Sequence, residues 1–465
     1  MTSLTIATAG LGLLDDALRA QGATTVPVDW RPPAGGDAAD VALLTRAYAD
    51  DAIEAGNREA IRRLQSSRPH LIGAGRAGDL IPGLEGRMIL HSGPPIEWDR
   101  MCGPQRRAAG AAAVMEGWVA DPESGATMLE RGEITLAPAH SLGAAGAMCG
   151  IISPSMAVWA VRDEETGIEA WSPFCDGPGE SFWLGVDSPA AIARQRLMAD
   201  RVAPGIDRAL ALRGPIDVFA LLSQAVTMGD DCHMRHQAAT MLLVRDLMPA
   251  MSERALDAIP PLAAVTADNG HFALTLTIAS CRAALQGIVG VPRSSLIAFI
   301  SRNGTDAAVM LAGLPGVWFT APAAMVGDAL YRPGFSPADA APDIGDSALV
   351  ECAGLGGAAS AASPSVAAFL GGTLADAVAR TRLMGGISVD TSERFRIPFL
   401  DGEGCPLGID ARLCLDTGDT PLINTGILHR TEGGQIGAGV AKTPLAPIRD
   451  ALRALVPEPA VRTTG

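Results

Sequence analysis

A long stretch of helical periodicity in the middle of the chain, with strand-like runs on both sides, most constrains the fold. Over residues 188–285 apolar side chains recur at helical spacing, as at Ile206 and Leu210 and again at Met241 and Met248. Before and after this stretch, strand fragments alternate with glycine-rich turns. The sequence therefore predicts an α/β mixed (α+β) fold of several lobes with mixed sheets and a small helical domain inserted mid-chain.

The length of the chain supports a division into several parts, because 465 residues are too many for one compact core. Changes in pattern predict boundaries near residues 85, 187 and 290. The expected parts are an N-terminal α/β segment (1–85), an α/β lobe (86–187), a helical domain (188–290) and a C-terminal α+β lobe rich in Gly turns (291–465).

The first thirty residues have a strand–helix–strand pattern, over residues 4–7, 13–20 and 25–29. Gly10, Gly12 and Asp29 match part of a dinucleotide-binding fingerprint, but Asp15 stands where its third glycine belongs. No third parallel strand follows promptly. The pattern favours a small α/β unit without a nucleotide, and a nicotinamide-dependent oxidoreductase stays open as an alternative.

Charge and composition exclude several classes of protein. A net charge of −15 without a basic stripe argues against nucleic-acid binding, and 48% hydrophobic residues exclude general disorder. Lys442 is the only lysine, so phosphate or carboxylate recognition is expected from arginines and backbone N–H groups. We predict no cofactor.

The cysteines and the apolar segments bear on location. The eight cysteines form no Cys-x-x-Cys pair and are expected to be reduced. The first residues lack a basic, apolar leader pattern. Residues 142–161 carry no charge, but their Gly, Ser and Pro154 favour a buried strand–loop–strand over a membrane span. The sequence predicts a cytoplasmic protein that does not enter a membrane.

Residues 228–236, Met-Gly-Asp-Asp-Cys-His-Met-Arg-His, are the densest group of reactive side chains. Asp230, ahead of a long apolar pattern, fits a helix N-cap, and Asp231 and Arg235 are spaced to pair on that helix. On this interpretation His233 lies in the first turn, where it suits acid–base work or an anion at the helix end.

A metal site is the competing interpretation of these residues. Cys232, His233 and His236 match no standard zinc spacing, and adjacent Cys and His side chains on a helix point in different directions. We therefore predict no metal.

Three further segments combine polar side chains with flexible turns. Arg302 and Asn303 precede Gly304 in a turn that suits an oxyanion, although an ordinary Asn-Gly hairpin explains the last two equally well. Asp343, Asp346 and Glu351 lie ahead of a glycine-rich run and could orient a substrate amide or a magnesium ion. Alternatively, Asp346 caps the segment and the glycines permit close packing. Residues 424–439, with Asn424, Thr425, His429 and Gly437, could surround an anion with N–H groups.

Taken together, these segments resemble the YlbE/AllG family over nearly the full length. The resemblance is carried by Met228-Gly-Asp-Asp-Cys-His-Met-Arg, Ser301-Arg-Asn-Gly, Trp318-Phe-Thr-Ala-Pro, Pro342-Asp-Ile-Gly-Asp-Ser, Pro421-Leu-Ile-Asn-Thr-Gly-Ile, Gly434-Gln-Ile-Gly-Ala-Gly, His91-Ser-Gly-Pro-Pro, Gly103-Pro, Glu116-Gly-Trp and Val28-Asp-Trp-Arg-Pro-Pro-Ala-Gly-Gly. The sequence departs from the family pattern at Glu97, Cys232, His236 and Arg430.

The resemblance implies a subunit of a carbamoyltransferase-like enzyme acting on a small ureido or amide acid, as in allantoin breakdown. The reaction implied is oxalurate and phosphate giving oxamate and carbamoyl phosphate, or a related one. The partners implied are FdrA-like and AllH-like subunits in an oligomeric complex, with a small anionic substrate such as carbamoyl phosphate.

Chemistry assigns roles to individual residues, since such a reaction needs an anion clamp, oxyanion donors and a proton shuttle. We predict Arg235 and Arg302 for the clamp, Asn303 and Asn424 for the oxyanion or amide, and His233 for the proton. Asp230 or Asp346 would orient the imidazole or the substrate nitrogen. The predicted substrate-binding set also includes Thr425, His91 and Gly437.

A second class of function stays open, in which the chain is a non-catalytic scaffold subunit. Its glycine-rich faces would then dock the FdrA-like and AllH-like partners that carry the active site.

Overall fold

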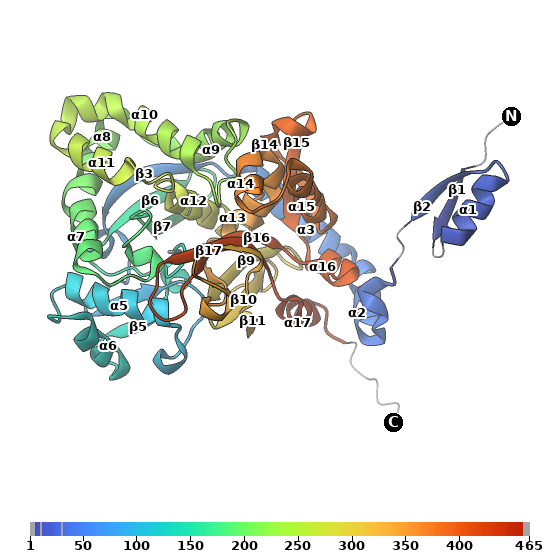
Figure 1. Cartoon of the computed structure of the whole chain (residues 1–465), viewed down its shortest axis with the longest axis horizontal. Helices are drawn as coiled ribbons and strands as arrows, with labels where there is room; N and C mark the ends of the chain where they lie inside the picture. Colours follow the sequence, from blue (N-terminus) through green and yellow to red (C-terminus); the bar gives the residue numbers. More distant parts are fainter. Residues whose placement is uncertain (1–4, 10–11, 29–30, 459–465) are drawn as a thin grey trace.

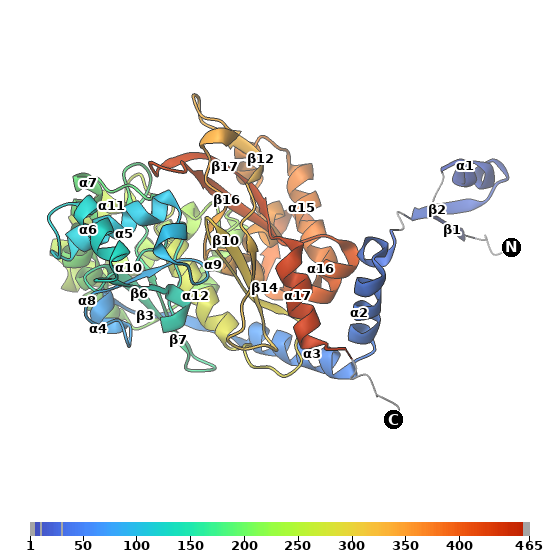
Figure 2. The same cartoon turned by 90° about the horizontal axis from the view of Figure 1, so that it is seen from below.

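The computed structural model describes residues 5–9, 12–28 and 31–458. It has helices interleaved with several small sheets (Figure 1), which confirms the predicted mixed α/β class. The N-terminal unit pairs strands β1 (Thr5–Ala9) and β2 (Thr24–Val28) in parallel around α1 (Gly12–Ala20), and it stands apart from the rest of the molecule in Figures 1 and 2. Gly10 and Asp29 of the dinucleotide pattern lie outside the described residues.

One half of the molecule is built on a four-stranded sheet in the order β7-β6-β3-β8. Its strands are Glu169–Pro173, Ala157–Asp163, Pro69–Arg76 and Ile216–Asp217, and all neighbours are antiparallel. Strands β4 (Met88–His91) and β5 (Thr135–Pro138) form a parallel pair. The nearby helices are α4 (Ala77–Leu80), α5 (Gly103–Met115) and α6 (Pro122–Glu130). The uncharged residues 142–161 form a loop followed by strand β6, so the first strand of the predicted strand–loop–strand is missing.

The mid-chain region is helical, as its periodicity predicts. Its helices are α7 (Pro189–Leu197), α8 (Ala203–Arg213), α9 (Val218–Thr227), α10 (Gln237–Arg254), α11 (Ile259–Thr266) and α12 (Leu274–Gln286). All of α12 from Leu274 to Leu285 is buried, and the helix contacts β3, β6, β7 and β9. A helix that is buried on every face belongs to the core of a large protein rather than to its surface.

The other half carries the remaining sheets. They are a four-stranded sheet β11-β10-β9-β13 (Phe319–Pro322, Asp306–Leu311, Ile297–Asn303, Ile344–Gly345), a three-stranded sheet β12-β17-β16 (Gly327–Tyr331, Gln435–Lys442, Leu422–Leu428) and the hairpin β14–β15 (Ser388–Ile397, Glu403–Ile409). The helices of this half are α13 (Leu349–Cys352), α14 (Pro364–Phe369), α15 (Leu374–Gly386), α16 (Ala411–Thr417) and α17 (Leu445–Leu455).

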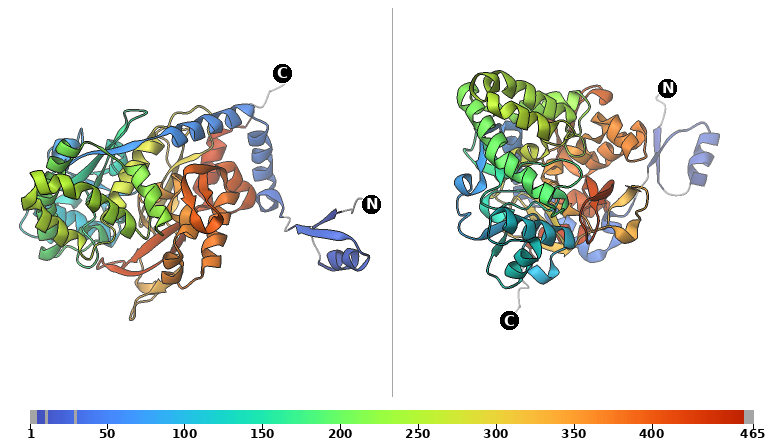
Figure 3. Two further views of the ribbon diagram at one scale, coloured as in Figure 1. Left: turned by 90° about the horizontal axis from the view of Figure 1, so that it is seen from above. Right: turned by 60° about the vertical axis from the view of Figure 1, so that its left-hand side comes forward.

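The N-terminal helices α2 (Ala38–Tyr48) and α3 (Asp51–Ser66) pack on this second half, as the views of Figure 3 show. Asn57 of α3 donates to Asp410 Oδ2 at 3.0 Å, and Ser295 Oγ donates to Asp410 Oδ1 at 2.7 Å. Gly56 leaves no room for a side chain, because a Cβ there would lie 2.5 Å from Pro292 O. A buried polar network therefore ties α3 to the start of β9 and of α16.

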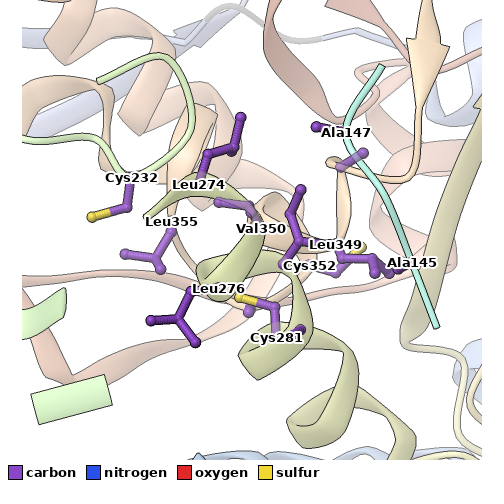
Figure 4. Packing of buried hydrophobic residues seen from close by; sticks show 14 of the residues in the cluster. Ala145, Ala147, Cys232, Leu274, Leu276, Cys281, Leu349, Val350, Cys352 and Leu355 are labelled. Atoms are coloured by element: carbon purple, nitrogen blue, oxygen red, sulfur yellow. The ribbon is translucent and has the colours of Figure 1, made fainter. Parts of the chain in front are cut away.

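The hydrophobic core is continuous across both halves. Figure 4 shows its centre, where Leu274, Leu276 and Cys281 of α12 lie close to Leu349, Val350 and Cys352 of α13. Cys232 lies beside them, which anchors the reactive loop 228–236 in the core. Among the described helices none is both long and apolar enough to span a bilayer.

Candidate functional site

A cavity of about 660 Å³ lies between the two halves. One wall comes from loop 228–236 and the start of α12, and the other from α14 and the sheet β12-β17-β16. Its polar wall residues are His233, Arg235, Gln237, His271, Arg332, Ser347, Ser365, Thr425 and Gln435, besides Tyr331. The cavity therefore combines imidazoles, guanidinium groups and hydroxyls without a lining carboxylate.

Loop 228–236 is not the first turn of a helix, and the predicted pairing of Asp231 with Arg235 is wrong. Helix α10 begins at Gln237, and the carboxylate of Asp231 instead accepts backbone N–H bonds from His233, Met234 and Arg235 at 3.1, 3.0 and 2.8 Å. Cys232 has a φ of 60°, in the left-handed region. The fully buried Asp231 therefore closes a tight loop where the periodicity suggested a helix.

His233 is paired with a buried carboxylate that comes from α13 and does not line the cavity. Its Nδ1 lies 2.7 Å from Oε1 of Glu351, a residue of α13, and both side chains are buried. Gly356 (φ 56°) makes this pair possible, because a Cβ there would lie 2.2 Å from Glu351 Oε1. A carboxylate on Nδ1 fixes the tautomer and leaves Nε2 as the proton-exchanging nitrogen.

Asp230 and Arg235 form an ion pair at the edge of the same loop. The other carboxylate oxygen of Asp230 accepts the Ala239 N–H of α10 at 2.8 Å. Asp230 therefore caps the first turn of α10, although His236 and not Asp230 occupies the N-cap position. Burial raises the pKa of Asp230 to about 6, although the Ala239 N–H and Arg235 oppose the rise. Across the cavity Arg332 is exposed, and no carboxylate among the described side chains pairs with it.

Two more histidines lie beside His233. His271 Nε2 bonds the Met234 carbonyl at 2.8 Å, and burial holds the pKa of His271 below its usual value. His236 is fully buried, and neither ring nitrogen has a hydrogen-bond partner among the described residues. Burial, reinforced by His271 and His233, holds the pKa of His236 well below its usual value.

The buried His236 predicts a specific loss of stability in acid. Its folded pKa lies below the unfolded one, so the unfolded chain binds more protons as the pH falls through about 6.5, and folding weakens there. We expect His236→Asn to reduce the slope of unfolding free energy against pH below pH 6.5, by up to about 1.4 kcal/mol per pH unit. Urea midpoints at several pH values measure it, and parallel wild-type and variant curves would contradict it.

Four of the predicted site residues line the cavity: His233, Arg235, Thr425 and Gly437. Asn424 lies behind the wall, where its amide donates to Asp231 Oδ2 at 2.9 Å while its Oδ1 lacks a partner among the described residues. In this arrangement Asn424 supports the loop that carries His233.

Arg302 and Asn303 are committed to buried contacts. Arg302 Nε donates to Asp343 Oδ2 at 2.7 Å, Nη1 donates to Gly345 O at 2.5 Å, and both charged side chains are buried. Asp343 also accepts from Thr425 Oγ1 at 3.2 Å, which joins the pair to the cavity wall. Asn303 caps the β9–β10 hairpin by accepting the Thr305 and Asp306 N–H groups, so the hairpin interpretation holds for it.

Asp346 does not touch His233. It accepts hydrogen bonds from Gly93 N, Gly146 N and Ser301 Oγ at 2.8, 3.0 and 2.5 Å, and His140 Nε2 lies 3.2 Å away. Burial acts to raise the pKa of Asp346, but His140, Ser301 and Gly93 hold it below the usual value. His91 is buried nearby, and its Nδ1 bonds Ser92 O at 2.8 Å.

Sequence reasoning missed Glu351 as the partner of His233, and Arg332 and His271 as cavity residues. Glu351 carried a signal, because it lies in the carboxylate-rich segment that follows residue 343, but its partner lies 118 positions away. Nothing in the local pattern marks Arg332 or His271. Among the described residues no group of three His, Cys, Asp or Glu side chains is arranged to hold a metal ion.

Comparison with known proteins gives relatives along most of the chain. The family model described as oxamate carbamoyltransferase subunit AllG matches residues 134–347, which include loop 228–236. The chain is 37% identical over 405 residues to the oxamate carbamoyltransferase subunit AllG of Escherichia coli (strain K12), covering 86% of this chain and 96% of that one. It is 34% identical over 450 residues to the uncharacterized protein YahG of the same strain, covering 95% of each.

A solved structure has the same fold. The crystal structure of a conserved protein of unknown function from Enterococcus faecalis V583 superposes with a TM-score of 0.84 at 34% sequence identity, covering 87% of this chain and 97% of that one. The resemblance noted from the sequence motifs is therefore confirmed, and the chain belongs to the AllG family.

Proposed function

We propose that the chain is a subunit of a carbamoyltransferase-type enzyme that moves a carbamoyl group between a small ureido acid and phosphate. The observation that carries the proposal is the buried His233–Glu351 pair on the wall of a cavity that also carries Arg235 and Arg332. The similarity to an oxamate carbamoyltransferase subunit names the reaction to test, oxalurate and phosphate giving oxamate and carbamoyl phosphate.

Arg332 and Arg235 would bind the two anionic groups of the reactants. The net charge of the chain is −15, so an anion has to be held by local positive charge. Arg332 is free of carboxylates among the described side chains, whereas Arg235 shares its charge with Asp230. Arg332 is therefore the stronger candidate for phosphate or for the substrate carboxylate, and Arg235 for a second contact.

His233 would carry the proton. Attack of a phosphate oxygen on the ureido carbonyl forms the C–O bond, and the C–N bond to oxamate then breaks. The phosphate hydroxyl loses a proton and the leaving amide nitrogen gains one. His233 Nε2 can take the first proton and deliver it to the nitrogen, because Glu351 holds Nδ1 and stabilises the imidazolium between the two steps.

The oxyanion of the tetrahedral intermediate needs a donor on the opposite wall. Ser347, just ahead of α13, lines the cavity, and we propose its hydroxyl group as this donor. Thr425 lines the cavity too, but its hydroxyl group already donates to Asp343 Oδ1 at 3.2 Å. Asn424 is a positioning residue on this proposal, because its amide holds Asp231 and through it the loop of His233.

A scaffold role is the second candidate, and exposed apolar side chains at the cavity favour it. Leu330 and Phe369 line the cavity, yet they are 52% and 55% exposed. Such a rim suits a partner subunit that closes the cavity. We propose FdrA-like and AllH-like subunits as these partners, in the cytoplasm, and either of them could carry the chemistry.

Reconstitution tests the proposed reaction. The chain would be purified alone and with co-expressed FdrA-like and AllH-like subunits, and carbamoyl phosphate formation from oxalurate and phosphate would be measured. We expect activity in the complex, and a KM for phosphate or oxalurate raised roughly 10–100-fold in Arg332→Met, because one charge-assisted contact is lost.

Arg131→Met is the matched control, because Arg131 is exposed and lines neither this cavity nor the neighbouring one. A complex without activity on oxalurate would contradict the substrate, and an unchanged KM would contradict the role of Arg332.

A further inference from the structure

A second cavity, of about 400 Å³, has a lining that shares no residue with the first. It lies beside Asp346, since Gly93 and His140 on its wall contact that carboxylate while the next residue, Ser347, lines the first cavity. The described lining contains no Asp or Glu.

Arg282 of α12 supplies the positive charge of this cavity. The residue is 5% exposed, and Nη1 donates to Gln286 Oε1 at 2.6 Å. Its Nε is buried without a hydrogen-bond partner among the described residues, and no carboxylate among them lies within ion-pair distance of the guanidinium. A buried charge with unmade hydrogen bonds destabilises the folded state, so the presence of Arg282 here suggests that it binds a ligand.

Arg302 and Arg412, which are also buried, each have a carboxylate partner, and Arg282 does not. Arg302 is matched by Asp343 at 2.7 Å, and Arg412 by Asp410 at 2.7 Å. Arg282 has instead a neutral amide and the face of Phe299, whose ring centroid lies 4.4 Å from the guanidinium carbon. Burial lowers the pKa of Arg282 to about 10, although the nearby charge of Asp346 opposes the fall, so the guanidinium stays protonated at neutral pH.

The remaining walls suit a small, flat molecule. The ring centroids of Phe299 and Trp318 are 6.1 Å apart. The ring centroid of His140 lies 5.5 Å from that of Phe299 and 5.1 Å from that of Trp318. The Nδ1 of His140 also lacks a partner among the described residues. The prolines Pro94, Pro95, Pro138 and Pro315 complete a largely apolar lining.

We propose that this second cavity binds a small organic or inorganic oxyanion, whose carboxylate or phosphate oxygens pair with Arg282 and accept from His140. Any flat remainder of the ligand packs against Phe299 and Trp318. Arginine is suited to such groups because its planar fork presents several N–H donors in fixed directions. The site is separate from the carbamoyl chemistry of the first cavity and stands whether or not that proposal does.

Calorimetric titration of the full chain tests the proposal, with oxalate and inorganic phosphate as separate probes. We expect one or both to bind the wild type, and Arg282→Met to weaken that binding roughly 10–100-fold, the value of a charge-assisted contact. Which probe responds tells carboxylate from phosphate recognition. Arg332→Met, in the first cavity, removes any binding that belongs there and leaves the Arg282-dependent binding intact. Arg131→Met controls for the loss of a surface charge.

A second variant protects the test against misfolding of Arg282→Met. Ser141 is exposed at this cavity, so Ser141→Trp fills the space while leaving Arg282 in place, and we expect it to abolish the same binding. With Arg332→Met present to remove binding in the first cavity, binding that survives the further change Ser141→Trp or Arg282→Met in a folded chain would overturn the proposal. So would a wild type that binds neither probe at millimolar concentration.

Discussion

His233→Gln is expected to lower the rate of carbamoyl transfer by the reconstituted complex by roughly 10²–10⁴-fold, the usual value of a general acid–base residue. Glutamine keeps a planar polar group in the loop but cannot take up and release a proton. The loss should fall on kcat, because the phosphate and carboxylate contacts of Arg332 and Arg235 remain. Initial rates over a range of oxalurate concentrations separate kcat from KM.

Two companion variants make this result specific. Glu351→Gln keeps the hydrogen bond acceptor beside His233 but removes its charge, so we expect a smaller loss and a displaced pH–rate profile. His429→Gln, at a half-buried position that directly follows β16 and lies outside the cavity lining, should act like the wild type. A fully active His233→Gln complex would favour the scaffold role instead.

Arg302→Met should cost about 3–5 kcal/mol of unfolding free energy, because it leaves the buried carboxylate of Asp343 without its cation. The loss would also release the Asp343 contact to Thr425 on the cavity wall. Urea denaturation of the purified chain measures the effect, and combining Arg302→Met with Asp343→Asn should recover part of the lost stability.

An exposed pair provides the control for Arg302. Arg382 and Glu403 form an ion pair with both side chains about half exposed, so Arg382→Met should cost less than about 1 kcal/mol. If Arg302→Met were as mild as this control while weakening substrate binding, Arg302 would be a ligand-binding residue, as the sequence first suggested.

Local sequence signals predict the elements whose structure is decided locally. The Asn303-Gly304 turn predicts the hairpin of β9 and β10, and Gly304 adopts a φ of 77° there. The helical periodicity of residues 188–285 predicts α7 to α12, because apolar side chains that recur every three to four residues form one buried face along a helix. The strand–helix–strand start, now β1, α1 and β2, was also predictable from the local pattern of residues.

The site depends on contacts that the local pattern does not contain. Asp231 and Arg235 have helical spacing, but three backbone N–H groups compete for the Asp231 carboxylate and win, so the chain turns instead. The partner of His233 is brought by α13, from a segment that folds against α12. Polarity alone predicted Arg302 as an anion clamp, whereas its burial beside Asp343 follows from the packing of β9 against β13.

The single lysine, at the last position of β17, gives the molecule a chemical handle. Lys442 is exposed on the strand whose other end, at Gly437 and Ala438, forms the cavity wall. An amine-reactive fluorophore therefore has one side-chain target in the whole sequence, on the same strand as Gly437 and Ala438 of the cavity wall. Energy transfer from a dye there to a labelled subunit would report docking at the cavity rim without altering any residue of the cavity lining.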